Sequence, residues 1–217
     1  DPHNARFQAY HANFDRSVGS YQSAAEILAK AIRLDPELAV ARHFQGLLLH
    51  DLGQYPESIR AFDDAIRLDP DEADAYPDRA KTYLQMGQID QAFLDLDRAL
   101  ALDPDLAQAH LVRGQVHMAL NQLDEAVIAL DEASKSTLES WTFLKQLGEN
   151  YIKAVQPQAA LQPLLDSVGM TEGSRADESA EALHLLSVAY RDLDRPEQAA
   201  AAMERALSLN YTAAWAP

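Results

Sequence analysis

Apolar residues recur along most of the chain at intervals of three and four, the period of an amphipathic α-helix. Residues 39–52 keep this spacing, and a second helical stretch follows up to Leu68. The letters "LGQYPES" between them predict a turn, because Gly53 can adopt the positive φ that ends a helix and Pro56 suits the first turn of the next one. This part of the sequence therefore predicts a pair of antiparallel helices.

The same helix pair recurs every 34 residues. "AIRLDP" occupies 31–36 and again 65–70, and "ALALDP" ends at Pro104. A residue before proline resists the α conformation, so each Asp–Pro is expected to close a second helix. Small residues share the 34-residue period, which predicts close helix crossings with larger residues filling the neighbouring gaps. The small columns are Ala12, Gly46, Ala80, Gly114 and Gly148; Ala24, Ser58, Ala92, Ala126 and Ala160; and Ala31, Ala65, Ala99, Ala133 and Ser167.

Three stretches, "GLLLHDLGQYPESIRAFDDAIRLDP", "KTYLQMGQIDQAFLDLDRALALDP" and "GQVHMALNQLDEAVIALDEA", resemble the tetratricopeptide repeat family. The resemblance extends from Ala5 to about Ala213. It implies an all-α, right-handed superhelical solenoid of about six antiparallel helix pairs. We expect a single array over residues 1–217, with repeats at about 5–38, 39–72, 73–106, 107–140, 141–179 and 180–213.

The fifth repeat departs most from the pattern. Val155 stands where the turn glycine is expected, and Pro163 lies well inside the second helix, where it removes a hydrogen bond and predicts a bend. The polar letters "TEGSRADES" carry a five-residue insertion and predict an exposed loop over 171–179. We therefore expect the fifth repeat to be the least stable part of the array.

Both ends of the sequence read as parts of further repeats. Asp1–Pro2 lies 34 residues before Asp35–Pro36 and is similar to the tail of a preceding repeat, while "NYTAAWAP" after Leu209 is similar to the start of another. Neither end shows the polar capping helix that closes a solenoid. We therefore expect the sequence to be a segment of a longer chain.

The charge balance disfavours some partners. The chain holds 18 Lys and Arg against 34 Asp and Glu, a net charge of −16. Such a surface repels nucleic-acid phosphates and anionic lipid, and it keeps an elongated protein soluble. There is no cysteine, so disulfides and thiol catalysis are excluded. No apolar run approaches the roughly 20 residues of a transmembrane helix and no signal peptide is visible, which leaves cytoplasm and periplasm both open.

No pattern of catalytic or metal-binding residues stands out. His43 and His50 are seven residues apart, about 10 Å along a helix, which is too far for both rings to hold one ion easily. There is no HExxH spacing and no compact Cys/His set. GxSxG, phosphate-loop and GxGxxG segments are also missing. The sequence thus predicts no metal, no cofactor and no enzymatic activity.

The resemblance does imply a binding groove, because in this family the first helices of successive repeats line a concave side that usually receives peptides. The expected lining holds five Lys and Arg against three Asp and Glu, so it is less acidic than the whole chain. Leu47, Leu111 and Met118 are predicted to be exposed among polar groups, with Lys81 placed to meet an acidic group on a ligand. The candidate groove residues are His43, Leu47, His50, Lys81, Leu111, Gln115, Met118 and Lys145.

These observations predict a non-catalytic scaffold that binds a protein or peptide in the groove. Two alternatives stay open. The chain is a docking or regulatory segment of a larger enzyme or of a secretion or assembly subunit, or it is a structural module that self-associates through the ends of the array.

Overall fold

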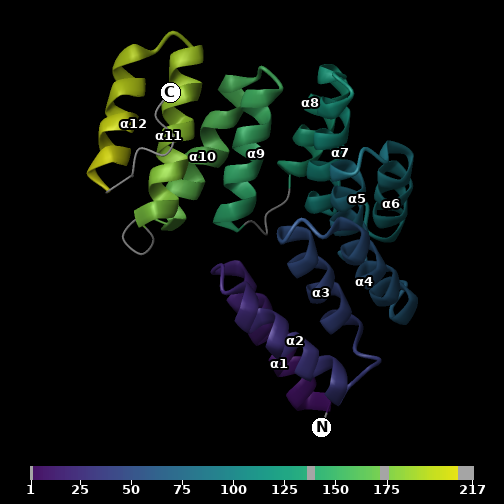
Figure 1. Cartoon of the computed structure of the whole chain (residues 1–217). Coiled ribbons are helices and arrows are strands. Elements are labelled where there is room, and N and C mark those ends of the chain that lie inside the picture. Colours follow the sequence, from purple (N-terminus) through teal and green to yellow (C-terminus); the bar gives the residue numbers. More distant parts are fainter. Residues whose placement is uncertain (1, 136–139, 172–175, 210–217) are drawn as a thin grey trace. The chain divides into compact units, whose positions relative to one another are not determined.

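The computed structural model describes residues 2–135, 140–171 and 176–209, and within these ranges the chain forms twelve α-helices and no strand. Consecutive helices pack side by side in antiparallel pairs (Figure 1). The bounds are α1 Pro2–Ser17, α2 Tyr21–Leu34, α3 Ala39–Asp51, α4 Tyr55–Leu68, α5 Ala75–Gln85, α6 Ile89–Leu102, α7 Ala107–Ala119, α8 Leu123–Ala133, α9 Trp141–Lys153, α10 Pro157–Thr171, α11 Ala176–Asp192 and α12 Pro196–Ser208.

The chain divides into two compact units, Asp1–Val112 and Arg113–Pro217, and the division falls inside α7. The N-terminal unit contains α1 to α6 and the first half of α7. The C-terminal unit contains the rest of α7 and α8 to α12. No helix in the described ranges is both long and apolar enough to cross a membrane.

Small residues bring the helices of each pair close together, as the repeat columns predict. In α3, a Cβ added to Gly46 would lie 2.7 Å from the ring of Phe62 on α4. The hydroxyl of Ser58 also donates to the carbonyl of Gly46 at 2.8 Å, so the two helices meet almost backbone to backbone. Ala9, Ala12 and Ala24 have no exposed surface, for the same reason.

The turn after each first helix contains one residue with positive φ. Gly53, at +71°, takes the conformation that the sequence predicts for it. The predicted stop at Asp69–Pro70 is also confirmed, because α4 ends at Leu68 and the N–H of Asp69 donates to the carbonyl of Ala65. The positions with positive φ are Gly19, Gly53, Gly87, Asn121, Val155 and Asp194.

The predicted loop over 171–179 is too long. Thr171 still belongs to α10, and α11 begins at Ala176, so both ends of that stretch are helical; residues 172–175 lie outside the described ranges. Ser179 donates a hydrogen bond to Thr171 at 2.8 Å, with both residues buried, which ties the two helix ends together. Asp177 and Glu178 favour a helix start here because carboxylates are stabilised at a helix N-terminus.

Candidate ligand-binding groove

First helices of the N-terminal unit enclose a hollow of about 360 Å³, within the range of small ligand pockets. Four of the candidate residues meet there: His43, Leu47 and His50 from α3 and Lys81 from α5. The wall is completed by Arg16, Asp74 and Gln108, which the 34-residue spacing also selects, and by Asp51 and Asp78, which it does not select. The full lining is Arg16, His43, Leu47, His50, Asp51, Asp74, Asp78, Lys81 and Gln108.

A second hollow of about 470 Å³ adjoins the first at the start of α3. Both hollows are lined by His43 and Asp74, and the second reaches Arg6 and Tyr10 on α1. Together they follow α3 from its first residue to its last. We call this pair of hollows the N-terminal groove.

Hydrogen bonds determine which ring nitrogen carries the proton in the two histidines of the groove, His43 and His50. The Nε2 of His43 lies 2.7 Å from a carboxylate oxygen of Asp78, which only accepts, so Nε2 carries the proton. The Nδ1 of His50 lies 2.9 Å from the hydroxyl of Thr82, and that hydroxyl donates to the carbonyl of Asp78 at 3.0 Å. Nδ1 must then donate to Thr82, which leaves the Nε2 of a neutral His50 as an acceptor.

Burial and the nearby ammonium of Lys81 lower the pKa of His50, so the ring is neutral at pH 7. The pKa of Asp74 is raised, chiefly by burial and then by the charge of Asp78. Both shifts have the same origin, since the groove is partly dry and its charges lie close together.

The balance of charged side chains in the hollow is more negative than the sequence predicts for the groove. The 360 Å³ hollow holds two cations and three carboxylates, because Asp51 and Asp78 join Asp74 on its wall. Arg16 of α1 is already paired with Asp51 at 2.5 Å, and His43 is paired with Asp78. Within the described part of the chain, Lys81 makes no ion pair, so its ammonium is the cation left for a ligand.

The prediction that Leu111 is exposed in the groove is wrong, because its side chain has no exposed surface and is not available to a ligand. Five of the thirteen residues of α7 are buried, so the covered arc of this helix is wider than the single apolar face assumed from spacing. The same position is buried in α5, where it holds Pro77. Leu111 is thus a core residue.

The remaining three candidates lie in the C-terminal unit and outside this groove. Gln115 and Met118 are half-buried on the second half of α7. Lys145 on α9 forms an ion pair with Glu181 on α11, and its ammonium lies 5.5 Å from the ring centre of Trp141. The positive charge of Lys145 is therefore already neutralised within the C-terminal unit.

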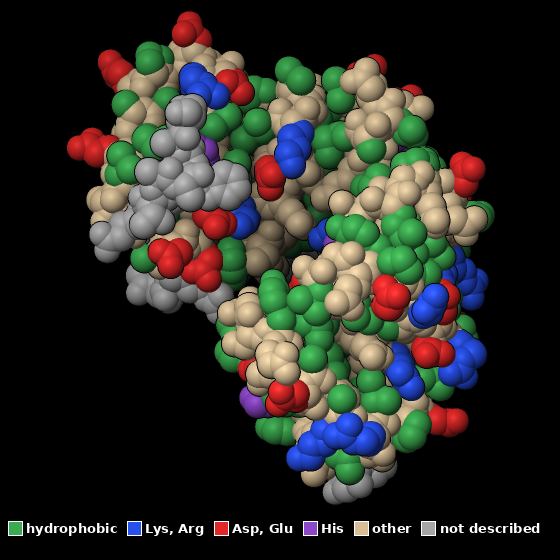
Figure 2. Space-filling model, viewed as in Figure 1, with side chains coloured by type: hydrophobic (Ala, Val, Ile, Leu, Met, Phe, Trp, Pro, Cys, Tyr) green, Lys and Arg blue, Asp and Glu red, His purple; other side chains and the backbone are tan. Residues whose placement is uncertain are grey.

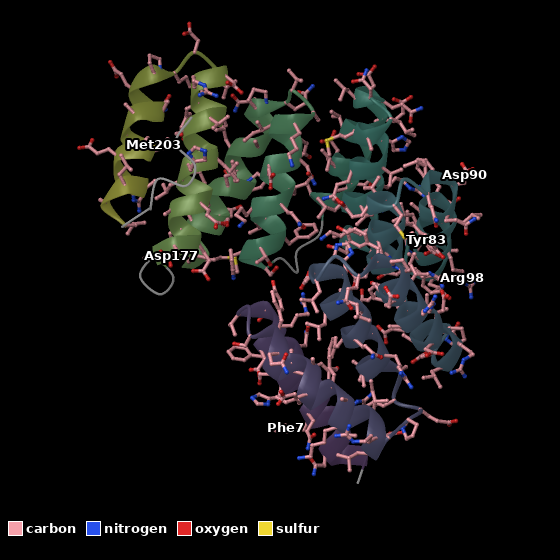
Figure 3. All side chains as sticks on the ribbon, viewed as in Figure 1. Phe7, Tyr83, Asp90, Arg98, Asp177 and Met203 are labelled. Carbon is pink, nitrogen blue, oxygen red and sulfur yellow. The ribbon has the colours of Figure 1, made fainter. Side chains whose placement is uncertain are left out.

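Sequence reasoning missed an arginine network beside the groove. Arg79 on α5 donates twice to Asp95 on α6, at 2.8 and 2.6 Å, and once to Asp63 on α4, at 2.5 Å. Its guanidinium also lies 5.9 Å from the rings of Tyr76 and Tyr83; Tyr83 is labelled in Figure 3. The network joins three helices from two repeats and holds α5, which carries Lys81. The signal in the sequence is a 16-residue spacing from Asp63 to Arg79 and from Arg79 to Asp95.

No group of three or more His, Asp and Glu side chains among the described residues is arranged to hold a metal ion. Several histidines instead bond to protein groups: the Nε2 of His110 lies 2.9 Å from the carbonyl of Pro104, and the Nδ1 of His117 lies 2.8 Å from the amide oxygen of Gln122. Charged side chains of both signs are present on the visible face of each unit in Figure 2.

Comparison with known families identifies the repeat. Two models of the tetratricopeptide repeat match residues 78–137 and 180–212, and a model described as a TPR repeat matches residues 46–87. Together they cover more than half of the sequence. The chain therefore belongs to the tetratricopeptide repeat family, whose members generally act as non-catalytic scaffolds for protein–protein interactions. No curated protein matches the chain.

Solved structures share the fold at low sequence identity. A thermophilic TPR protein of Thermus thermophilus has a TM-score of 0.69 and 18% identity, covering 92% of this chain and 99% of its own. PilW, a type IV pilus biogenesis factor, has a TM-score of 0.68 and 18% identity, covering 96% and 94%. YrrB, a TPR protein with an unusual peptide-binding site, has a TM-score of 0.53 and 20% identity, covering 84% and 91%. These similarities confirm the predicted all-α solenoid class.

Proposed function

We propose that the chain is a non-catalytic scaffold that binds a peptide segment of a partner protein in the N-terminal groove. The observation that carries this proposal is the ammonium of Lys81, without an ion pair among the described residues, beside a half-buried Leu47 in a hollow of about 360 Å³. An acidic side chain or a C-terminal carboxylate of the ligand would pair with Lys81. An apolar side chain next to it would cover Leu47.

The carboxylates of the groove give the ligand a second requirement. Asp74 lines both hollows and makes no ion pair among the described residues, so a backbone N–H or a basic side chain of the ligand would be favoured there. The preferred ligand is thus a peptide with an acidic group and an apolar residue close together, and with a donor a few residues away.

The similarity to YrrB and to PilW supports an interaction role, since one is described as having a peptide-binding site and the other as a biogenesis factor. The partner of this chain is not identified by either similarity. The alternative that the chain is a docking segment of a larger enzyme or assembly subunit stays open. It differs from the proposal only in which protein the groove would bind.

A peptide-display screen with the intact chain tests the proposal. Selected peptides should be rich in Asp, Glu or a free C-terminus next to an apolar residue. Lys81→Ala should weaken their binding by about tenfold or more, because an ion pair that excludes water is lost. Lys30→Ala is the matched control, because Lys30 is exposed on α2 and lines neither hollow. Equal binding to the Lys81→Ala variant and the parent would contradict the proposal.

A further inference from the structure

One ring nitrogen of His50 is left for a ligand in the N-terminal groove. The Nδ1 atom donates to the hydroxyl of Thr82, so Nε2 is the acceptor nitrogen of the neutral ring. Nε2 makes no hydrogen bond within the described part of the chain, and it is not one of the buried polar atoms that lack a partner there. It is therefore open to the hollow of about 360 Å³ that His50 lines.

Most charges around this ring are already compensated. Arg16 is paired with Asp51, and Asp78 is paired with His43. Lys81 makes no ion pair among the described residues and, after burial, is the main cause that lowers the pKa of His50. The titratable and charged groups that line the hollow or face the ring are Arg16 on α1, His43 and Asp51 on α3, Tyr55 on α4, Asp74 just before α5, and Asp78 and Lys81 on α5.

An acidic group of a ligand changes the charge that the ring of His50 meets. A carboxylate paired with Lys81 cancels the repulsion between the ammonium and a protonated ring. Asp51 and Asp78 act on the ring in the opposite direction and raise its pKa, so the ring binds a proton more readily once that repulsion is gone. The proton adds an N–H at Nε2, and a charged donor of this kind favours the carboxylate in return.

We propose that His50 makes the N-terminal groove a pH-dependent binder of acidic peptides, whose affinity rises as the pH falls from 7.5 to 5.5. The inference rests on the proposed function, since it concerns the same ligand at Lys81. Its sign follows from linkage, because a ligand that raises the pKa of a group binds more tightly where that group is protonated. An opposite charge within about 4–6 Å shifts a pKa by roughly one unit or more, so we expect a gain of about threefold to tenfold.

The free chain gives the first test, which needs no ligand. The Hε1 resonance of His50 in the NMR spectrum is assigned by its loss in His50→Gln and is then titrated from pH 5 to pH 8. The pKa of His50 should lie below 6.5 in the parent, and it should rise in Lys81→Ala because the nearby ammonium is removed. A pKa of His50 that is the same in the parent and in Lys81→Ala would overturn the proposal.

Calorimetric titration with the strongest peptide of the display screen gives the second test. The parent should bind this peptide more tightly at pH 5.5 than at pH 7.5, whereas the peptide with its acidic groups replaced by neutral amides should show no such gain. His50→Gln should lose most of the gain. His110→Gln is the matched control and should keep it, because the Nε2 of His110 is bonded to the carbonyl of Pro104 and the residue lines neither hollow.

The same titrations in two buffers of different ionisation enthalpy count the protons that binding takes up. Near pH 6 the parent should take up a fraction of a proton, and His50→Gln should take up less. Equal affinity at both pH values, or a gain that is lost in His43→Gln and kept in His50→Gln, would overturn this inference and leave the proposed function intact. If the screen yields no peptide, or if Lys81→Ala binds as tightly as the parent, the proposed function fails and this inference fails with it.

Discussion

At the scale of single residues, Val155 carries a larger backbone cost than its counterparts in the other repeats, which are glycine, asparagine or aspartate. Its φ is +59°, a conformation that glycine adopts freely and that costs an L-residue about 1–2 kcal/mol, more so when the side chain is β-branched. The side chain is 71% exposed, so removing it sacrifices little packing. Val155→Gly should raise the free energy of unfolding by about 1–2 kcal/mol. Urea denaturation measures the change.

The reverse substitution is the matched control for this prediction. Gly87 occupies the same place two repeats earlier, with φ of +70° and no atom within 4 Å of an added Cβ. Gly87→Val should therefore destabilise through backbone strain alone. A stability that is unchanged by both variants would contradict the strain argument.

The histidine of the groove links stability to pH. Because the pKa of His50 is lower in the folded chain than the ordinary 6.5, the unfolded chain binds more protons below about pH 6.5. Stability should therefore fall between pH 7.5 and 5.5. The pKa of His184 is lowered in the same direction by burial and by Arg191. In His50→Gln, the fall measured by denaturation at the two pH values should be smaller, and a fall as large as in the parent would refute this assignment.

At the scale of helices, the small residues decide how closely each pair packs. A Cβ added to Gly148 on α9 would lie 2.5 Å from Cγ of Leu164 on α10, an atom held near the backbone. Gly148→Ala should lower the free energy of unfolding by about 1–3 kcal/mol, because one of the two helices must shift. Gly169→Ala, on the exposed side of α10 with nothing near an added Cβ, should instead stabilise by about 0.5–1 kcal/mol. Thermal unfolding of both variants separates crowding from helix propensity.

Helix bounds were the most predictable feature of this chain because each is set locally. The positive φ of Gly53 and the Asp69–Pro70 stop act on their own backbone, and the structure ends the helices there. Burial is less local. The exposure of Leu111 could not be read from its spacing, because the pattern within one helix does not tell how many neighbours cover it. The start of α11 was missed since acidic residues are typical both of loops and of the first turn of a helix.

At the scale of the whole molecule, the sequence predicted the groove in part. His43, Leu47, His50 and Lys81 line one hollow because a 34-residue step returns to the same side of successive first helices. Asp51 and Asp78 were missed because they lie one residue beyond the selected positions, where a side chain still reaches the hollow. The Arg79 network was missed because its residues come from three helices. A comparison of positions 34 residues apart does not bring together residues that are 16 apart.

The fifth repeat concentrates several local costs, which in a solenoid remain local because stability is summed over repeats and their neighbours. Val155 is strained, and Pro163 inside α10 has no N–H for the carbonyl four residues earlier. A surface hollow of about 330 Å³ also lies against Pro163.

We therefore expect amide exchange in residues 155–171 to be faster than in the equivalent stretch 53–68, where Gly53 relieves the turn and α4 contains no proline beyond its first turn. Proteolytic nicking should begin in the same fifth-repeat stretch. Val155→Gly should slow exchange across α10 while leaving α4 unchanged, because its effect is confined to the repeat that contains it. Equal protection of 53–68 and 155–171 in the parent chain would show that the array unfolds as one cooperative body, and the local account of its stability would then be wrong.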